Sequence, residues 1–232
     1  MKHSGKARRA AFKLIVRSLI AVIVLWGLGV LIWAIVNVLT GIALAIIPVV
    51  VVLWILFAVF TLYFFRDPVA QAPAGANLVL SPAHGKVDVI DSISEPLFMG
   101  GECRRVSMFL SVFDVHVQNA PVTGRVTFSK YTVGQFLNAL KTESALYNEN
   151  LLLGFEMTER AMCKIGVRLI AGVIARRIVP FVQAGEEVVR GERISLIQFG
   201  SRADVYLPAN AQIKVELGQH VTGGETILAV LD

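Results

Sequence analysis

The chain has 232 residues, of which 55% are apolar and only 17% are charged, and its formal net charge is +5 at pH 7. An average soluble domain carries about a quarter charged residues. The composition therefore disfavours an ordinary cytosolic globule, and it excludes a disordered chain, a disulfide scaffold and a collagen-like rod.

Positive charge is concentrated at the N-terminus. Residues 1–17 carry six cations and no acid, residues 18–65 carry no charge, and residues 66–232 hold 16 cations against 17 acids. A domain that binds nucleic acid should carry its excess charge on the folded part. We therefore expect no nucleic-acid partner, and we interpret residues 1–17 as a basic cytoplasmic tail.

The uncharged segment 18–65 predicts a membrane anchor. As one helix it would extend about 72 Å, against a hydrocarbon core of about 30 Å. Two transmembrane helices joined by a turn at residues 37–41, with Pro48 inside the second, fit that thickness better. A hairpin leaves both of its ends on one side, which the positive-inside rule assigns to the cytoplasm, so we expect a domain at the inner face of the cell membrane. A cleaved signal peptide fits less well, because the apolar run is too long and no small-residue cleavage site stands out.

Residues 66–232 are predicted to form mainly strands. Short runs of β-branched and aromatic residues alternate there with Gly, Pro and Asp, which is typical of strands and turns. The expected strands are 78–80, 86–90, 105–113, 124–131, 151–157 and 163–174. One helix is predicted around residues 134–147, where apolar side chains recur on one face.

A weak internal repeat lies near the C-terminus. Residues 185–194 resemble residues 218–227, and each segment reads as a strand, a glycine turn and a strand. Small barrel-sandwich domains that carry biotin or lipoate have this pattern, but neither turn here contains the carrier lysine. The repeat therefore predicts a barrel-like or sandwich-like fold, and no carrier function.

The cysteines and histidines do not predict a metal site. Cys103 and Cys163 are isolated, so we expect two reduced, buried thiols in a cytoplasmic domain. His3 lies in the tail and His220 in a polar turn.

Three stretches carry more chemistry than a structural role needs. They are 81–87, with a histidine in a turn; 112–124, with His116 near the end of an apolar strand; and 197–207, with Gly200-Ser201 between two strands. A single Gly-Ser pair is usually a turn, and a lone histidine on an apolar strand is usually a core residue. Their combination, after an apolar segment closed by Tyr63–Pro68, points to an enzyme.

This combination resembles the phosphatidylserine decarboxylase proenzymes, in their short, membrane-anchored bacterial form. The resemblance runs from about Phe64 to the C-terminus. The matching motifs are Phe65-Arg-Asp-Pro68, Phe113-Asp-Val-His116 with Ala120-Pro121 and Gly124, Ala175-Arg-Arg-Ile178, and Phe199-Gly-Ser-Arg202 followed by Asp204-Val205. It implies a mainly β (α+β) catalytic domain, barrel-like or sandwich-like, over residues 66–232, behind a two-helix transmembrane hairpin.

The resemblance also implies self-cleavage between Gly200 and Ser201. The Ser201 hydroxyl would attack the Gly200 carbonyl, and elimination and hydrolysis would then leave a covalent pyruvoyl group at position 201. The products would be a β chain of residues 1–200 and an α chain of residues 201–232, which pair as a heterodimer of undetermined higher order. The pyruvoyl group would act as the electron sink in decarboxylation of membrane phosphatidylserine to phosphatidylethanolamine and CO₂.

The processing base is left open, because the sequence departs from the family pattern twice. His84 stands where most members have an aspartate, and Asn119 stands where longer bacterial forms have a second histidine. Either His84 is the base for Ser201, with Asp88 or Asp91 as its orienting carboxylate, or His116 serves both processing and decarboxylation. We favour His84 for processing and His116 for the decarboxylation cycle.

Substrate contacts are expected from cations near the membrane and from one polar segment. Arg66 and Arg176 are candidates for the phosphate and carboxylate of the headgroup. Arg66 could instead cap the helix or pair with Asp67. Asn148 belongs to a polar family segment that is either structural or close to the substrate.

Two other classes of protein were considered. A membrane-tethered, non-enzymatic β-barrel adaptor explains the apolar segment and the repeat, but gives no role to the Gly-Ser pair or the histidines. A serine hydrolase that uses Ser201 and His116 lacks the Gly-x-Ser-x-Gly elbow.

Overall fold

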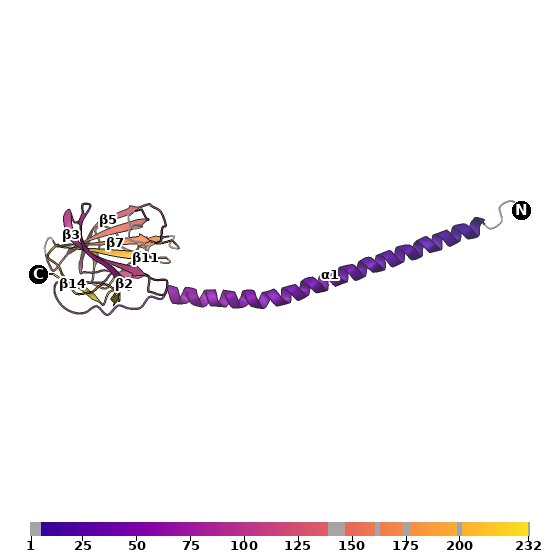
Figure 1. Ribbon diagram of the computed structural model, residues 1–232, viewed down its shortest axis with the longest axis horizontal. Helices are drawn as coiled ribbons and strands as arrows, with labels where there is room; N and C mark the ends of the chain where they lie inside the picture. Colours follow the sequence, from indigo (N-terminus) through magenta and orange to yellow (C-terminus); the bar gives the residue numbers. More distant parts are fainter. Residues whose placement is uncertain (1–5, 139–146, 161–162, 174–176, 199–200, 232) are drawn as a thin grey trace. The chain divides into compact units, whose positions relative to one another are not determined.

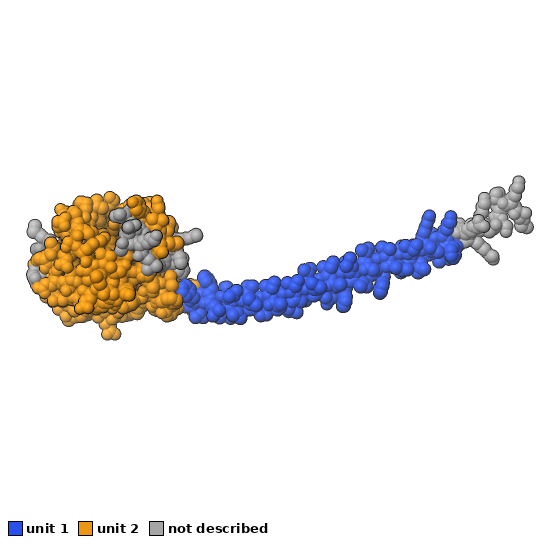
Figure 2. Space-filling model, in the orientation of Figure 1, with its two compact units in different colours: residues 1–60 blue, residues 61–232 orange. Residues whose placement is uncertain are grey.

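The computed structural model describes every residue except 1–5, 139–146, 161–162, 174–176, 199–200 and 232, with side chains described from residue 12 onward. The chain forms two compact units, residues 1–60 and residues 61–232 (Figure 2). Each unit is considered by itself below.

A single helix, α1 (Lys6–Phe64), accounts for the N-terminal part and contains 59 residues. Its segment Phe12–Phe64 has a mean hydropathy of 3.1, and none of that window is buried, so it is long and apolar enough to cross a membrane. The last turn of α1 belongs to the second unit. The expected two-helix hairpin is therefore not confirmed, since residues 37–41 continue the helix.

The polar residues at the expected turn are accommodated within the helix itself. The Asn37 amide donates to the Trp33 carbonyl at 2.8 Å, and the Thr40 hydroxyl donates to the Val36 carbonyl at 2.8 Å. Side chains that bond back to the preceding turn in this way leave the helical backbone bonds in place. Nothing in the local chemistry therefore requires a break at these residues.

The second unit is mainly β, as predicted. Its largest element is an eight-stranded antiparallel sheet in the order β13-β2-β3-β11-β7-β6-β5-β9. Its strands are β2 (Gly85–Glu95), β3 (Gly101–Leu110), β5 (Gly124–Thr132), β6 (Asn150–Met157), β7 (Lys164–Ala171), β9 (Glu187–Val188), β11 (Ser201–Leu207) and β13 (His220–Val221). Strands β2, β3, β5, β7 and β11 of this sheet are labelled in Figure 1.

Two three-stranded antiparallel sheets complete the unit, in the orders β1-β14-β12 and β4-β10-β8. Their strands are β1 (Leu78–Leu80), β4 (Val117–Asn119), β8 (Ile178–Pro180), β10 (Arg193–Ile197), β12 (Gln212–Ile213) and β14 (Ile227–Val230). The repeat seen in the sequence corresponds to β9-turn-β10 and β13-turn-β14. Gly185, Gly191, Gly218 and Gly224 all have positive φ, which explains the shared glycine spacing.

Strand β11 lies at the centre of the large sheet, between β3 and β7, and both of its faces are buried. Ala203, Val205 and Leu207 face the main hydrophobic core, whereas Tyr206 packs in a smaller cluster on the other face. Because side chains alternate along a strand, Ser201 lies on the main-core face.

The helix expected at residues 134–147 is not seen in its described part. The Gln135 amide donates to the Tyr147 carbonyl at 2.8 Å, and the Glu149 amide donates to the Gln135 carbonyl at 2.9 Å. These bonds to a neighbouring segment replace the i to i−4 bonds of a helix, and residues 133–138 are not helical. The remainder of the expected helix, 139–146, lies outside the described residues. Both cysteines are buried and free, as predicted.

Candidate active site

Ser201 begins the central strand of the large sheet. It is paired with Leu110 of β3 on one side and with Ala171 of β7 on the other, and it is fully buried. Its hydroxyl has no hydrogen-bond partner within the described part of the chain. A buried polar group left unpaired costs about 1–3 kcal/mol, so a serine is kept here at the expense of stability. Gly200, the other half of the expected cleavage site, lies outside the described residues.

His84 lies in the turn between β1 and β2 and is half-buried. Gly85, at the start of β2, allows this turn to lie directly against β3, because a Cβ there would come 2.4 Å from the Phe109 carbonyl oxygen. Phe109 is in turn paired with Arg202 of β11. The start of β2 is thus two strands from Ser201, a distance of about 10 Å at the usual strand spacing.

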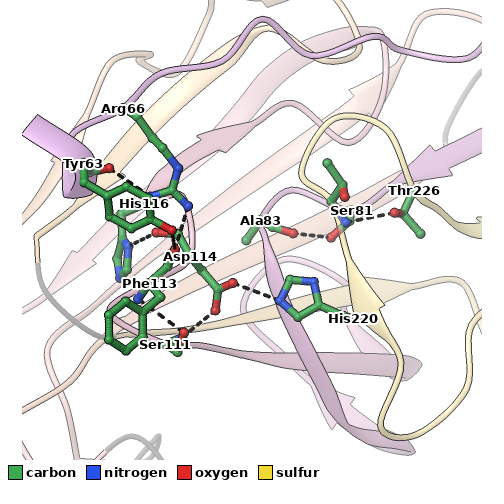
Figure 3. Close-up of polar contacts among 11 residues, drawn as sticks. Tyr63, Arg66, Ser81, Ala83, Ser111, Phe113, Asp114, His116, His220 and Thr226 are labelled. Carbon is green, nitrogen blue, oxygen red and sulfur yellow. Dashed lines mark hydrogen bonds and ion pairs between the residues drawn. The ribbon is translucent and has the colours of Figure 1, made fainter.

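His116 lies in the segment between β3 and β4 and is completely buried. Its Nδ1 lies 2.9 Å from the Asp114 carbonyl oxygen (Figure 3). Because a carbonyl only accepts, Nδ1 carries the proton in this contact and Nε2 is the basic nitrogen. The His116 carbonyl accepts a bond of 3.1 Å from the Ile197 amide, at the end of β10 and shortly before Ser201. The imidazole also packs on Phe64, with ring centroids 4.3 Å apart.

Both imidazoles are held in the neutral form. Burial lowers the pKa of His84, and the charge of Asp114 opposes that effect only in part. Burial also lowers the pKa of His116, against the carbonyl bond from Asp114, while Arg66 and His84 lower it further. At neutral pH each histidine can therefore accept a proton, as a general base must.

Asp114 acts on both His84 and His116, and the sequence analysis did not single it out as a site residue. Its carboxylate accepts from the Ser111 amide at 2.7 Å, and its other oxygen lies 2.9 Å from His220 Nε2 (Figure 3). The carboxylates first considered for orienting His84 have other partners: Asp88 pairs with Arg202 and Asp91 pairs with Arg105. The only sequence signal for Asp114 was its place in the motif that contains His116.

Arg66 is anchored at the end of α1 (Figure 3). It donates to the Tyr63 carbonyl at 2.9 Å and to the Phe113 carbonyl at 2.6 Å, and its guanidinium lies 4.0 Å from the centre of the Tyr63 ring. It therefore caps the helix. Asp67, the other partner considered for it, pairs with Arg193 at 2.6 Å.

Asn148 is buried and acts on the backbone. It accepts from the Leu137 amide and donates to the carbonyls of Leu137 and Ala171, each at 2.8 Å. Ala171 is the residue that pairs with Ser201. Asn148 therefore supports the strand end beside the serine, and Arg176 lies outside the described residues.

The second departure from the family pattern, Asn119, packs beside the first. Its amide donates to the Gly191 carbonyl at 2.8 Å. A Cβ on Gly223 would lie 3.0 Å from both the Asn119 amide oxygen and the ring of His84, so the glycine allows both side chains to approach. His84 and Asn119 thus occupy one packed neighbourhood.

Comparisons with known proteins identify the family of this chain. Residues 57–229 match the family model described as phosphatidylserine decarboxylase. Three relatives named phosphatidylserine decarboxylase proenzyme come from Desulfotalea psychrophila (42% identical over 176 residues, covering 76% of this chain and 81% of the relative), Cereibacter sphaeroides (44% over 180 residues, 76% and 77%) and Gluconobacter oxydans (46% over 180 residues, 76% and 79%).

These matches cover the β unit and favour neither the adaptor nor the hydrolase. The chain belongs to the phosphatidylserine decarboxylase family and is a carboxy-lyase that converts phosphatidylserine to phosphatidylethanolamine and CO₂.

Proposed function

We propose that the chain cuts itself between Gly200 and Ser201 and carries out decarboxylation with a pyruvoyl group made from Ser201. The observation that carries this proposal is the buried Ser201 hydroxyl on the central strand, which has no hydrogen-bond partner among the described residues. It is supported by two imidazoles that burial keeps neutral: His116, whose carbonyl accepts from the Ile197 amide, and His84, in the turn that leads into β2.

The surroundings of Ser201 fit a pyruvoyl group. In the elimination, Ser201 Oγ would leave with the Gly200 carboxylate and Cβ would become the pyruvoyl methyl group. A buried hydroxyl that has no hydrogen-bond partner among the described residues would thus give way to an apolar group that needs none. The keto oxygen would take the place of the Ser201 nitrogen on Cα. The pyruvoyl carbonyl supplies an electron sink for the carbanion that forms as CO₂ leaves. The strand pairs on both sides of Ser201 hold this end of β11 in place.

Self-cleavage begins at the Ser201 hydroxyl. As its oxygen attacks the Gly200 carbonyl carbon, a neighbouring imidazole takes the hydroxyl proton, and the amide C–N bond breaks to give an ester and a free Ser201 amine. Loss of the Cα proton then expels the Gly200 carboxylate and leaves a dehydroalanine. Water hydrolyses this residue to the pyruvoyl group and ammonia.

We assign to His84 the removal of the Ser201 hydroxyl proton during self-cleavage, and to His116 the later protonation of the decarboxylation product. The turn of His84 lies in the same row across the sheet as Ser201, and the charge of Asp114 acts on His84. His116 has its Nδ1 fixed on the Asp114 carbonyl, which directs its basic Nε2 away from that loop. A fixed tautomer suits a group that repeats proton donation in every turnover.

Headgroup recognition is assigned to Arg66, with Arg176 as a second cation and Asn148 as a positioning residue. Two backbone carbonyls, those of Tyr63 and Phe113, hold the guanidinium of Arg66. Its charge also acts on His116. A guanidinium fixed in this way can pair with a phosphate or carboxylate without much further loss of conformational freedom. Asn148 acts through the backbone of Ala171.

The two cleavage products are expected to stay together as a heterodimer. The chain of residues 201–232 would carry β11 to β14, and most of its strand partners come from residues 1–200. Strand β11 alone is paired along its length with β3 and β7. Cleavage before Ser201 therefore opens one backbone bond without removing a strand from the sheet.

Residues 1–17, 18–65 and 66–232 are proposed as a cytoplasmic tail, a membrane hairpin and the catalytic domain at the inner membrane. The apolar segment of 53 residues corresponds to about 80 Å of helix, more than twice a hydrocarbon core of about 30 Å. Two crossings would bury this surface, whereas one straight crossing would leave much of it in water.

The test is the intact mass of the purified chain under denaturing conditions, beside Ser201→Ala. We expect a fragment of residues 201–232 with a pyruvoyl start in the parent and an uncut chain in Ser201→Ala. Ser129→Ala, at an exposed serine on β5, is the matched control and should be cut normally. An uncut parent that still releases CO₂ from carboxyl-labelled phosphatidylserine would refute the pyruvoyl proposal.

A further inference from the structure

The loop that connects β3 to β4 exposes one aromatic ring. Phe113 has 64% of its surface exposed, although His116, three residues later, is fully buried. The Phe113 carbonyl accepts from Arg66 at 2.6 Å and from the Tyr63 hydroxyl at 3.2 Å (Figure 3). The backbone under the exposed ring is therefore attached to the end of α1.

The same loop is held by its own polar groups. The Asp114 carboxylate bonds the Ser111 amide at 2.7 Å and His220 at 2.9 Å, and the Asp114 amide donates to the Ser111 carbonyl at 3.0 Å. The Phe113 amide lies 3.3 Å from the Ser111 hydroxyl. The ring is thus presented on a fixed turn, and its exposure does not result from a loose loop.

The side chains beside the anchoring residues are apolar and exposed as well. Leu62 is 78% exposed and Phe65 is 39% exposed, and both belong to the same compact unit as Phe113. Tyr63 and Arg66 combine an apolar body with a polar end, the type of side chain that is enriched where helices leave the hydrocarbon. The Phe113 ring is therefore attached to the end of the apolar segment, where a bilayer surface would be met.

We propose that the loop Ser111–Asp114 is a membrane contact, in which the Phe113 ring enters the lipid interface beside the end of α1. This inference rests on the proposed membrane association of α1. Burial in lipid would remove the exposed apolar ring from water, which is favourable. Asp114 follows Phe113 in the chain, and its carbonyl is bonded to the His116 imidazole. The contact of Phe113 with lipid would therefore also position this imidazole at the lipid surface.

The experiment places a fluorescent reporter at the tip of the loop. Trp26, Trp33 and Trp54 are first replaced with phenylalanine, and Phe113→Trp is introduced into the full chain in phosphatidylethanolamine and phosphatidylglycerol nanodiscs with brominated acyl chains. Leu97→Trp is the matched control. Leu97 is 54% exposed and lies in the β2–β3 turn, at the opposite end of β3.

We expect bromines near the headgroup to quench Phe113→Trp at least twofold more strongly than bromines near the chain ends, with little quenching of Leu97→Trp. The proposal would be overturned if Phe113→Trp and Leu97→Trp were quenched equally, or if Phe113→Trp were not quenched at all. If the tryptophan-free background does not fold, a nitroxide on Phe113→Cys, with Leu97→Cys as control, gives the same comparison through its accessibility to oxygen and to a soluble nickel complex. Quenching does not require turnover, so failure of the proposed chemistry would be seen separately as an inactive chain with a lipid-inserted ring.

Discussion

Removal of Asp88 is expected to destabilise the protein far more than removal of a surface carboxylate. Asp88 accepts two bonds from Arg202, whose side chain is only 1% exposed. Asp67 accepts one bond from Arg193, and both of those side chains are more than 40% exposed. Asp88→Ala leaves the buried guanidinium of Arg202 without the carboxylate that pairs with it, whereas Asp67→Ala leaves a cation in water.

The magnitudes follow from burial. Breaking a buried ion pair from one side costs about 3–5 kcal/mol. Asp88 is itself 29% exposed and the charge of Asp204 also acts with Arg202, so we expect about 2–3 kcal/mol for Asp88→Ala. Exposed pairs contribute about 0–1 kcal/mol, which sets the expectation for Asp67→Ala. For a unit of this size each kcal/mol lowers Tm by about 2–4 °C.

The assay is thermal unfolding of the two variants in the same detergent, in a Ser201→Ala background so that cleavage does not differ between samples. We expect Tm to fall by about 5–10 °C for Asp88→Ala and by less than about 3 °C for Asp67→Ala. Asp88→Ala with Arg202→Met should recover part of the loss, because the guanidinium is then no longer buried without the Asp88 carboxylate, although Asp204 also loses this cation. Equal losses for the two single variants, or no recovery in the double variant, would show that burial of Arg202 does not govern the effect.

Three further outcomes are expected. His116→Gln should still be cut but should lose at least about a hundredfold in turnover, measured by CO₂ release, because it removes only the product's proton donor. Since burial lowers the pKa of His84 and His116, the unfolded chain binds more protons below about pH 6.5, so stability should fall as pH drops below that value and stay level above it. Cleavage should begin to fall only at a lower pH than stability does, because the basic imidazole is lost only when pH reaches the lowered pKa of the folded chain. Gly223→Ala should slow cleavage severalfold, because its Cβ would press on His84 and Asn119. The control is Gly100→Ala, where the space is open but φ is positive, so this change should lower stability and leave cleavage unchanged. Mass spectrometry measures the cleavage, and thermal unfolding measures the stability.

The fold was predictable where local chemistry decides it. Six strands were placed with their ends within about five residues of the observed ones, because β-branched runs end at glycine, proline or aspartate. The order of the sheet was not predictable, since β11 pairs with β3, whose residues are far away in the chain. The helix predicted at 134–147 and the turn predicted at 37–41 are not seen in the described residues, and the reason is the same for both. In both segments polar groups found backbone partners that a periodicity pattern does not contain.

The candidate site was predictable as a set of residues, but its electrostatics were not. Ser201, His84 and His116 each stood in an unusual motif. Asp114 was overlooked because its importance comes from contacts with Ser111 and His220, and His220 is distant in sequence. Which carboxylate acts on a histidine depends on the packing of loops, and this packing has no local sequence signal.

The replacement of the usual aspartate by His84 has a consequence for His116 that can be measured. Protonated His84 lowers the pKa of His116, as does Arg66, while Asp114 raises it. His84→Asp would exchange a group that becomes positive for one that is negative at neutral pH. The pKa of His116 should therefore rise, and its basic form should be lost at a higher pH than in the parent.

The measurement is a histidine titration by NMR on the uncut Ser201→Ala chain with labelled imidazoles. His84→Asn is the control, because it removes the cation without adding an anion and should raise the pKa of His116 by less. If His84→Asp left that pKa unchanged or lowered it, the two imidazoles would not share the electrostatic environment described above. The assignment of separate proton-transfer roles to His84 and His116 would then lose its physical basis, because that assignment depends on the action of His84 on the pKa of His116 and of Asp114 on both.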